Sequence, residues 1–144
     1  MKAQNGDLSL VVVDYLHLMS TPKKAENRQV EVSELSRGLK ILARDLDVPV
    51  MALSQLNRSL EYRTEKRPML ADLRESGAVE QDSDVVCFIY RDDTYHPDSS
   101  DKGTAEIIVA KHRNGPTAKI RLAFVEHLTR FADLARGAVT NDEG

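Results

Sequence analysis

Apolar residues gather in short runs along the chain, and polar segments separate the runs. Five of them occupy residues 8–16, 48–54, 84–91, 105–111 and 119–125. Their richness in Val and Ile and their polar boundaries predict strands. The first three lack an alternation of apolar and polar positions, which is typical of strands buried on both faces of a largely parallel, helix-covered sheet. We therefore expect Cys87, inside the third run, to be a small core residue.

Between the first two runs, apolar positions recur every three or four residues, as they do along one stripe of an amphipathic helix. The stripe consists of Val32, Leu35, Leu39, Leu42 and Leu46. It predicts a helix over residues 28–46, which Asn27 caps at its start and which Pro49 prevents from continuing. A strand, a helix and a strand in this order predict a βαβ unit with parallel strands and a right-handed crossover.

The last two runs flank the turn sequence Asn-Gly-Pro at 114–116, which predicts an antiparallel hairpin. Lys111 and Arg113 stand just before this turn, and the alternation of side chains along a strand predicts that they share a face. The segment 111–130 carries five Lys or Arg residues against one acidic residue, a local charge of +4. A guanidinium beside an ammonium group suits a polyphosphate, although such charges also protect an exposed sheet edge from aggregation.

Composition places these elements in one globular domain. The chain has 144 residues, of which 41% are hydrophobic and 30% charged, and this excludes disordered, collagen-like and coiled-coil proteins. No apolar run approaches the roughly 20 residues that span a bilayer, and no secretory signal follows the N-terminus. We therefore expect a soluble, cytoplasmic protein with no membrane partner. The net charge of −3 means that any binding to DNA rests on a local site.

Polar residues follow two of the predicted parallel strands. Asp14 ends the run LVVV, and Gln55 follows the run VMALS. Ligands of open parallel sheets bind at the carboxyl ends of the strands, where a carboxylate is able to hold Mg²⁺ through water beside a nucleotide. Gln55 is suited to position a water molecule or to contact a terminal phosphate. Each residue alone is equally suited to cap a turn or to satisfy loop amides, but the pair on adjacent strands favours a nucleotide site.

The segment 72–84, DLRESGAVEQDSD, fits neither helix nor strand periodicity. Gly77 permits a backbone turn and the close approach of a ligand to the main chain. Arg74 is able to contact a phosphate, and main-chain amides near Gly77 are able to cradle one. A surface ion pair of Arg74 with Glu75 or Asp72 at the start of an ordinary helix is the structural alternative.

Four motifs, read in order, closely resemble the C-terminal motor domain of bacterial replicative DNA helicases of the DnaB family. They are VVVDYLHLM, SQLNRSLE, DLRESGAVEQDSD and KHRNGPTAKIRLAF, and the resemblance extends over nearly the whole chain. It implies an α/β protein with a partial RecA-like P-loop NTPase fold. In that fold a mainly parallel central sheet has flanking helices and a C-terminal antiparallel hairpin.

The resemblance also implies an ATP-dependent DNA helicase that uses ATP and Mg²⁺. Such helicases form ring-shaped homohexamers, translocate 5′ to 3′ along single-stranded DNA and unwind duplex DNA at the replication fork. Primase and a helicase loader are the further partners that the family implies. The expected location is the cytoplasm, at the nucleoid and the replication fork.

Position by position, the resemblance implies roles at the nucleotide. Asp14 matches the Walker B aspartate that organises Mg²⁺, in this interpretation through water. Gln55 matches the residue that senses the terminal phosphate. Lys111 and Arg113 match the lysine and the arginine finger that reach the triphosphate bound to a neighbouring subunit. Asp14, Gln55 and Arg113 are therefore the expected catalytic residues.

The resemblance also implies roles at the DNA. Arg74, Glu75 and Gly77 match the central-channel loop that holds the DNA backbone. Two residues depart from the family pattern, because His17 and His112 stand where the family commonly has Gln. Neither occupies a principal catalytic position, so they bear on fine tuning.

A larger departure is the missing phosphate-binding loop. That loop needs the pattern G-x-x-x-x-G-K-[ST], and none of the seven glycines is followed by Lys. We therefore expect residues 1–134 to be the C-terminal portion of a motor domain that is inactive alone, followed by a flexible tail at 135–144. A truncated gene, a split gene and a cut piece of a longer protein are equally compatible with the sequence. The alternatives to a helicase fragment are a non-catalytic module that binds DNA or joins hexamers, and another ATPase of the RecA superfamily.

Overall fold

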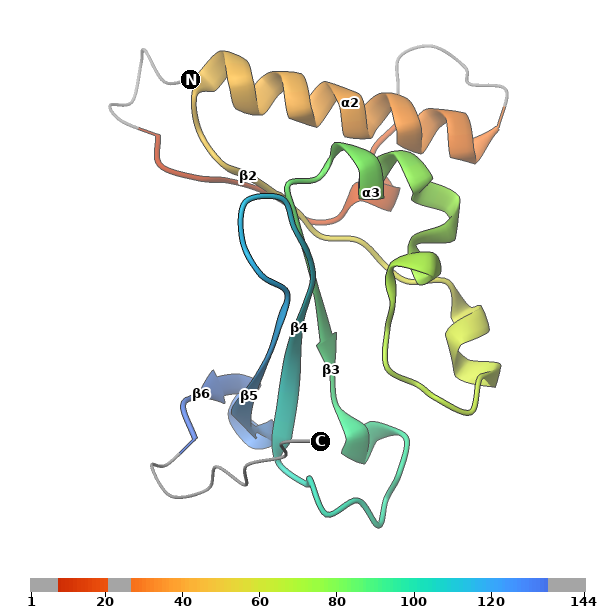
Figure 1. Ribbon diagram of the computed structural model, residues 1–144, viewed down its shortest axis with the longest axis vertical. Coiled ribbons are helices and arrows are strands. Elements are labelled where there is room, and N and C mark those ends of the chain that lie inside the picture. The colour runs from red at the N-terminus through yellow and green to blue at the C-terminus, as the bar shows by residue number, and fades with distance from the viewer. Residues whose placement is uncertain (1–7, 21–26, 135–144) are drawn as a thin grey trace. The chain divides into compact units, whose positions relative to one another are not determined.

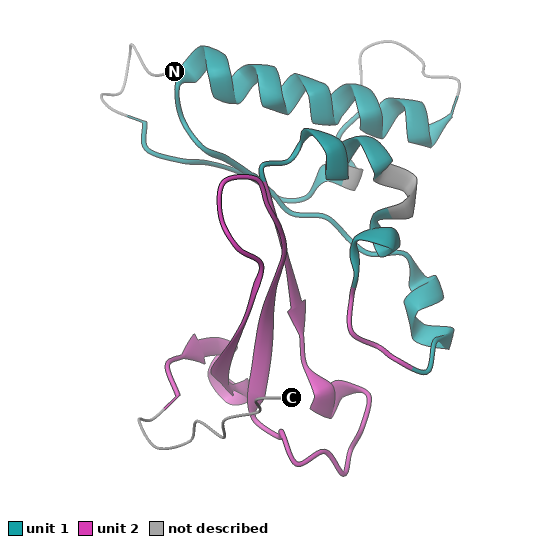
Figure 2. Cartoon of the chain, in the orientation of Figure 1, with its two compact units in different colours: residues 1–64, 69–84 teal, residues 65–68, 85–144 magenta. Residues whose placement is uncertain are grey.

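The computed structural model describes residues 8–20 and 27–134, and within these ranges it leaves out the side chains at positions 17 and 74–76. The chain divides into two compact units (Figure 2). The first unit consists of residues 1–64 and 69–84, and the second of residues 65–68 and 85–144. The tail at 135–144 lies outside the described residues, so its flexibility stays a prediction.

Helices and strands follow the chain in an order close to the predicted one (Figure 1). The helices are α2 (Arg28–Leu46) and α3 (Gly77–Asp82), and the strands are β1 (Val11–Val13), β2 (Val50–Ala52), β3 (Val85–Tyr90), β4 (Thr104–His112), β5 (Ala118–Val125) and β6 (Arg130–Ala132). Short 3₁₀ helices cover Leu16–Leu18, Arg58–Tyr62, Leu70–Ser76, Asp92–Thr94 and Glu126–Leu128. The observed strands β1 and β2 are shorter than the apolar runs that predicted them.

In the first unit, β1 and β2 pair in parallel and α2 connects them. The register aligns Val11 with Val50 and Val13 with Ala52. This confirms the predicted βαβ unit and its parallel strands.

Helix α2 has the bounds that the sequence predicted, and its ends explain why. The side chain of Asn27 accepts a hydrogen bond from the N–H of Val30 at 3.0 Å, which satisfies one of the free donors of the first turn. The helix ends at Leu46, the next residue, Asp47, has a left-handed backbone (φ 51°, ψ 48°), and Pro49 follows. Within the predicted apolar stripe Val32 is fully buried, whereas Leu42 is 38% exposed.

Two side-chain contacts fasten the segment 82–84 to α2. The hydroxyl of Ser36, a buried residue, donates to Asp82 Oδ2 at 2.9 Å. Lys40 forms an ion pair with Asp84. They fix α3 against the middle of α2.

The second unit is a four-stranded antiparallel sheet in the order β3-β4-β5-β6. Strands β4 and β5 pair from Thr104 opposite Ala123 to Val109 opposite Ala118. This confirms the predicted hairpin around the Asn-Gly-Pro turn.

The pairing of β3 corrects the expected mainly parallel sheet. Among the described residues, parallel pairing is limited to β1 and β2, and β3 runs antiparallel to β4. A parallel partner needs a long crossover, usually through a helix. The connection between β3 and β4 contains only the single-turn 3₁₀ helix Asp92–Thr94, and it reverses the chain direction.

The burial of β3 also corrects the expectation for Cys87. Val86, Phe88 and Tyr90 are buried, while Val85, Cys87 and Ile89 lie on the alternate, exposed face. The sequence run is apolar on both faces, so its composition did not distinguish the covered face from the open one. The prediction that Cys87 is a core residue was wrong for this structure.

Residues 65–68 cover the buried face of this sheet. The guanidinium of Arg67 lies 4.8 Å from the centre of the Tyr90 ring. It also donates to both carboxylate oxygens of Glu106, at 3.0 and 2.7 Å. This paired, stacked arginine holds the short segment on the sheet although the segment belongs to a polar stretch of the sequence.

Candidate nucleotide and DNA sites

The carboxyl ends of β1 and β2 lie side by side. The N–H of Leu53 donates to the carbonyl oxygen of Val13 at 2.9 Å, and the N–H of Leu16 donates to the carbonyl oxygen of Leu53 at 2.8 Å. Asp14 therefore leaves β1 opposite Leu53, and Gln55 lies two residues after Leu53, beyond the end of β2. Both side chains are exposed. The peptide bond between Asp14 and Tyr15 is cis.

This edge has the donor set of a site for a hydrated cation and a phosphate. A carboxylate such as Asp14 is a hard oxygen ligand, and Mg²⁺ commonly keeps several waters and takes one or two carboxylates with substrate phosphates. The described residues hold no group of three or more His, Cys, Asp or Glu side chains that would enclose a metal. By their chemistry, the Asp14 carboxylate and the Gln55 amide fit a cation held mainly by water and a nucleotide. The roles of Asp14 and Gln55 in it stay predictions.

The predicted DNA segment, residues 74–77, joins two short helices. Arg74 and Glu75 lie in the 3₁₀ helix Leu70–Ser76, and their side chains are outside the described part. Gly77 begins α3 with an ordinary right-handed backbone (φ −50°, ψ −31°), and a Cβ built there meets nothing within 4 Å. The backbone freedom that was expected of Gly77 is therefore not used, although its main chain is exposed.

The tip of the β4–β5 hairpin carries Lys111 and Arg113. Strand β4 ends at His112, so Arg113 is the first residue of the turn. Lys111 is half-buried and Arg113 is exposed. The shared face was predicted from the alternation of side chains along a strand. Lys111 lies in the strand but Arg113 does not, so this alternation does not apply to the pair.

The imidazole of His112 packs on the turn. A Cβ at Gly115 would lie 2.4 Å from His112 Cε1 and 2.5 Å from its Nδ1. Any other residue at 115 would displace this ring, which is the far end of an exposed side chain. His112 thus has a structural contact at a position where the sequence departs from its family pattern.

The candidate residues are divided between the two units. Asp14, Gln55 and the segment 74–77 belong to the first unit, and Lys111 and Arg113 belong to the second. Each unit thus contributes its own set of candidate groups. Asp14 and Gln55 share one sheet edge, and Lys111 and Arg113 share one hairpin tip.

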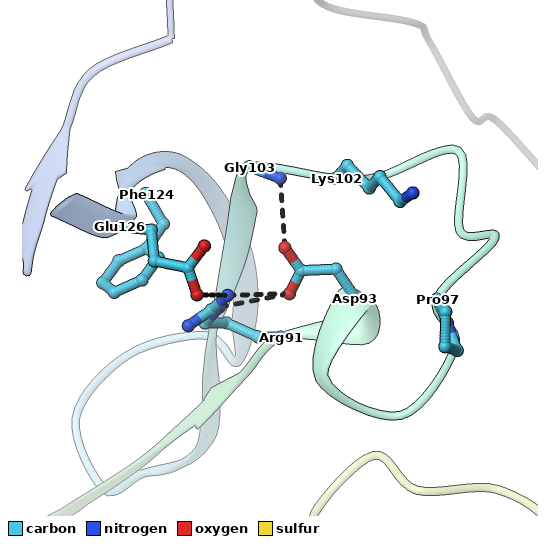
Figure 3. A pocket seen from close by; sticks show the side chains of 7 residues that line it. All are labelled: Arg91, Asp93, Pro97, Lys102, Gly103, Phe124 and Glu126. Atoms are coloured by element: carbon cyan, nitrogen blue, oxygen red, sulfur yellow. Dashed lines mark hydrogen bonds and ion pairs between the residues drawn. The ribbon is translucent and has the colours of Figure 1, made fainter.

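A pocket in the second unit was not predicted. It has a volume of about 380 Å³ and is lined by Arg91, Asp93, Pro97, Lys102, Gly103, Phe124 and Glu126 (Figure 3). The guanidinium carbon of Arg91 lies 4.1 Å from the centre of the Phe124 ring. Arg91 also pairs with Asp93 at 3.1 Å and with Glu126 at 3.6 Å. The guanidinium therefore forms a fixed wall of the pocket.

The turn between β3 and β4 completes this wall. Asp93 accepts from the N–H of Gly103 at 3.2 Å, and Gly103 has the positive φ of 70° that favours glycine. Hydrogen bonds from Arg91 and then from the Gly103 N–H lower the pKa of the Asp93 carboxyl. The only sequence signal for the pocket was the charged Arg-Asp-Asp triplet after an apolar strand, because Phe124 comes from the distant β5.

The carboxylate of Asp92 accepts several hydrogen bonds within the same turn. The hydroxyl of Tyr90 donates to Asp92 Oδ1 at 2.6 Å, and His96 Nδ1 lies 3.0 Å from the same oxygen. Hydrogen bonds from Ser99, Tyr90 and His96 lower the pKa of Asp92 from 3.8 to about 2. Burial, and next the hydrogen bond to Asp92, raise the pKa of the Tyr90 phenol.

In the described residues, no helix is both long enough and apolar enough to cross a membrane.

Residues 1–133 match the family described as the DnaB-like helicase C-terminal domain.

Two proteins with similar sequences are described as replicative DNA helicases. The chain is 56% identical to the replicative DNA helicase DnaB of Pasteurella multocida over 140 residues, which are 97% of this chain and 30% of that protein. It is 54% identical to the replicative DNA helicase DnaB of Haemophilus influenzae over 140 residues, with the same two shares. The chain thus spans about 30% of the length of these curated relatives.

Solved structures agree with these sequence matches. One of them, described as an ATPase domain, matches with a TM-score of 0.88 and 47% identity, over 93% of this chain and 47% of that one. A second solved structure matches with the same TM-score and identity, over 93% of this chain and 33% of that one. It is described as the structure of a DnaB-like replicative helicase and its interactions with primase.

Proposed function

The chain belongs to the DnaB-like helicase C-terminal domain family, and on that premise we propose that it is the part of a replicative helicase motor that completes the ATP site and contacts DNA. Because the chain belongs to this family, the alternative of a different RecA-superfamily ATPase has no support. The observation that carries the proposal is the shared edge of β1 and β2, where Asp14 and Gln55 leave adjacent parallel strands. Parallel sheets bind ligands at this edge.

In the proposed mechanism, ATP and Mg²⁺ supply the reacting phosphoryl group and its counter-charge. Asp14 would hold the hydrated cation at the nucleotide, and Gln55 would contact the terminal phosphate and sense its presence. Lys111 and Arg113 reach the triphosphate of a neighbouring subunit and stabilise charge that develops during transfer. Catalysis of this kind depends on positioning and electrostatics, with little covalent chemistry from the protein.

The proposed coupling to DNA uses the segment 74–77. Arg74 pairs with a phosphate of single-stranded DNA, Glu75 belongs to the same DNA-holding loop, and the exposed main chain at Gly77 lets the DNA backbone approach. The whole protein, in this proposal, is a homohexamer in the cytoplasm at the replication fork. It unwinds duplex DNA in the 5′ to 3′ direction and works with primase and a helicase loader.

The absence of a G-x-x-x-x-G-K-[ST] sequence favours a second candidate function. A chain without this loop lacks the lysine and the amides that hold the phosphates. As an independent protein it would be a non-catalytic module that binds DNA weakly or joins hexamers and blocks them.

A chimera tests the proposal directly. This chain replaces the matched 140 residues in the DnaB protein of Pasteurella multocida, which supplies the remaining part of the motor. We expect the chimera to have Mg²⁺-dependent, DNA-stimulated ATPase and 5′ to 3′ unwinding activity. The isolated chain should show neither turnover nor tight ATP binding by calorimetry. A folded hexameric chimera without ATPase would overturn the proposed function and leave the non-catalytic module.

A further inference from the structure

The carboxylate of Asp72 is buried and fully engaged within the first unit. Its side chain is 7% exposed. Arg63 Nη1 donates to Oδ1 at 2.9 Å, and Arg63 Nη2 donates to Oδ2 at 3.1 Å. The N–H of Met69 donates to Oδ2 at 2.8 Å. Such a two-pronged arginine pair fixes orientation as well as distance, which a single-point contact does not.

The same residue is also bound through its main chain. The N–H of Asn57 donates to the carbonyl oxygen of Asp72 at 3.4 Å. The side chain of Asn57 accepts from the N–H of Ser59 at 3.0 Å and so starts the 3₁₀ helix that ends just before Arg63. Both ends of the segment 57–63 are thus fastened to Asp72, one to its main chain and the other to its side chain.

The segment 57–63, held to Asp72 at both ends, lies along the chain between the two candidate sites of the first unit. Gln55 lies two residues before Asn57, and Arg74 lies two residues after Asp72. Only two residues of chain on either side thus separate Gln55 and Arg74 from the hydrogen-bonded segment between them. Leu60 in the middle of the segment is buried, which anchors the segment in the first unit.

We propose that Arg63 and Asp72 are positioning residues that couple the nucleotide edge at Gln55 to the DNA segment at residues 74–77. This inference rests on the proposed function. Neither residue contacts nucleotide or DNA in this account. They hold the segment between the two sites in one arrangement, so that binding at one site biases the other.

Two variants in the chimera test this coupling. Asp72→Asn keeps the shape of the side chain and removes its charge, and Arg63→Lys keeps the charge and removes the two-pronged geometry. The control is Asp84→Asn, which breaks the exposed Lys40–Asp84 ion pair of the same unit. For each protein we would measure the ATPase rate without DNA, the rate with saturating single-stranded DNA, and the melting temperature.

We expect both variants to keep the DNA-independent rate within about threefold and to lose most of the stimulation by DNA, with Asp84→Asn keeping both. The coupling is reciprocal in binding, so a second readout is the ratio of DNA affinities with a non-hydrolysable ATP analogue and with ADP. This ratio should fall toward one in Asp72→Asn and Arg63→Lys.

Two outcomes would overturn the coupling alone. One is DNA stimulation and an affinity ratio equal to those of the unvaried chimera. The other is a proportional loss of both ATPase rates that follows the melting temperature, which would make the pair purely structural. An unvaried chimera that folds without any ATPase would instead overturn the proposed function, and the coupling with it.

Discussion

The N–H of Leu53 donates a hydrogen bond to the carbonyl oxygen of Val13 at 2.9 Å, one residue before Asp14. This bond sets the ends of β1 and β2 level with each other. Asp14 and Gln55 consequently leave the sheet along the same edge, although the long helix α2 separates them in sequence. The proposed ATP site depends on this alignment.

Arg74→Ala in the chimera should weaken binding to single-stranded DNA almost independently of base sequence. A phosphate contact releases counterions, so the dependence of affinity on salt should also decrease, with a slope about 0.7 smaller for one lost contact. Titrations at several salt concentrations measure both effects. The exposed Arg44 on α2 provides a matched control, Arg44→Ala, which should change neither. An unchanged affinity and salt slope for Arg74→Ala would return the segment to a structural role.

Gly38→Ala should stabilise the isolated chain by about 0.5 to 1 kcal/mol, because glycine in a helix interior loses more backbone entropy on folding than alanine. Gly38 lies inside α2, and a Cβ built there meets nothing within 4 Å. Urea denaturation measures the free energy of unfolding. Arg37→Ala, at the adjacent exposed position, should change it little. A loss of stability in Gly38→Ala would show that this surface of α2 is more closely covered than the structure indicates.

Gly115→Ala should destabilise the chain, because the new Cβ would lie 2.4 Å from His112 Cε1. The imidazole must shift, and a side chain forced about 30° away from its rotamer costs about 0.5 to 1.5 kcal/mol. The double variant His112→Ala/Gly115→Ala should recover most of the loss. Thermal denaturation of the two single variants and the double variant measures the interaction. Strictly additive effects would contradict the packing of His112 on the turn.

Asp92 should make the stability of the chain depend on acidic pH. Its pKa is lowered from 3.8 to about 2 in the folded protein, first by the hydrogen bond from Ser99. The folded state therefore favours the charged carboxylate. The stabilisation is fully present above about pH 4 and is lost as the pH falls through about 2.

Urea denaturation between pH 2 and pH 6 tests this expectation. The stability difference between the unvaried chain and Asp92→Asn should be constant above about pH 4 and shrink below it. Asp98→Asn, at an exposed carboxylate of the same connection, is the control. A difference that does not change with pH would show that Asp92 acts only through its neutral hydrogen bonds.

Local signals in the sequence predicted the elements that depend on local interactions. Helix α2 was predicted to the residue because its apolar period, the Asn27 cap and Pro49 all act within a few positions. The β4–β5 hairpin was predicted because the Asn-Gly-Pro turn sets its reversal. The shared edge of Asp14 and Gln55 followed from the βαβ order, since that order specifies parallel strands.

Features that depend on distant partners could not be predicted in the same way. The run that became β3 is apolar on both faces, so it indicated neither its antiparallel partner nor the exposure of Cys87. Arg91 meets Phe124 only because β3, β4 and β5 lie in one sheet. The hydrogen-bonded pair of Arg63 and Asp72 requires a reversal of the chain between them, and no turn motif in the sequence predicts that reversal.

Mixed rings of two inactive chimeras test the central claim most directly. Arg113→Ala removes the proposed finger, which in other phosphoryl-transfer enzymes is worth on the order of 10³ to 10⁵ in rate. Asp14→Asn removes the proposed ligand of hydrated Mg²⁺. Each variant should fold and form hexamers with almost no ATPase. If Asp14 of one subunit works with Arg113 of its neighbour, mixed rings contain some interfaces with both residues intact.

The decisive measurement is therefore the ATPase rate of the mixture as the proportion of the two variants changes, with mixing of subunits confirmed by native mass spectrometry. We predict partial recovery with a maximum at intermediate proportions, and none when the two variants are kept in separate rings. Mixed rings that form and remain as inactive as either parent at every proportion would contradict the assignment of Asp14 and Arg113 to one shared site between subunits.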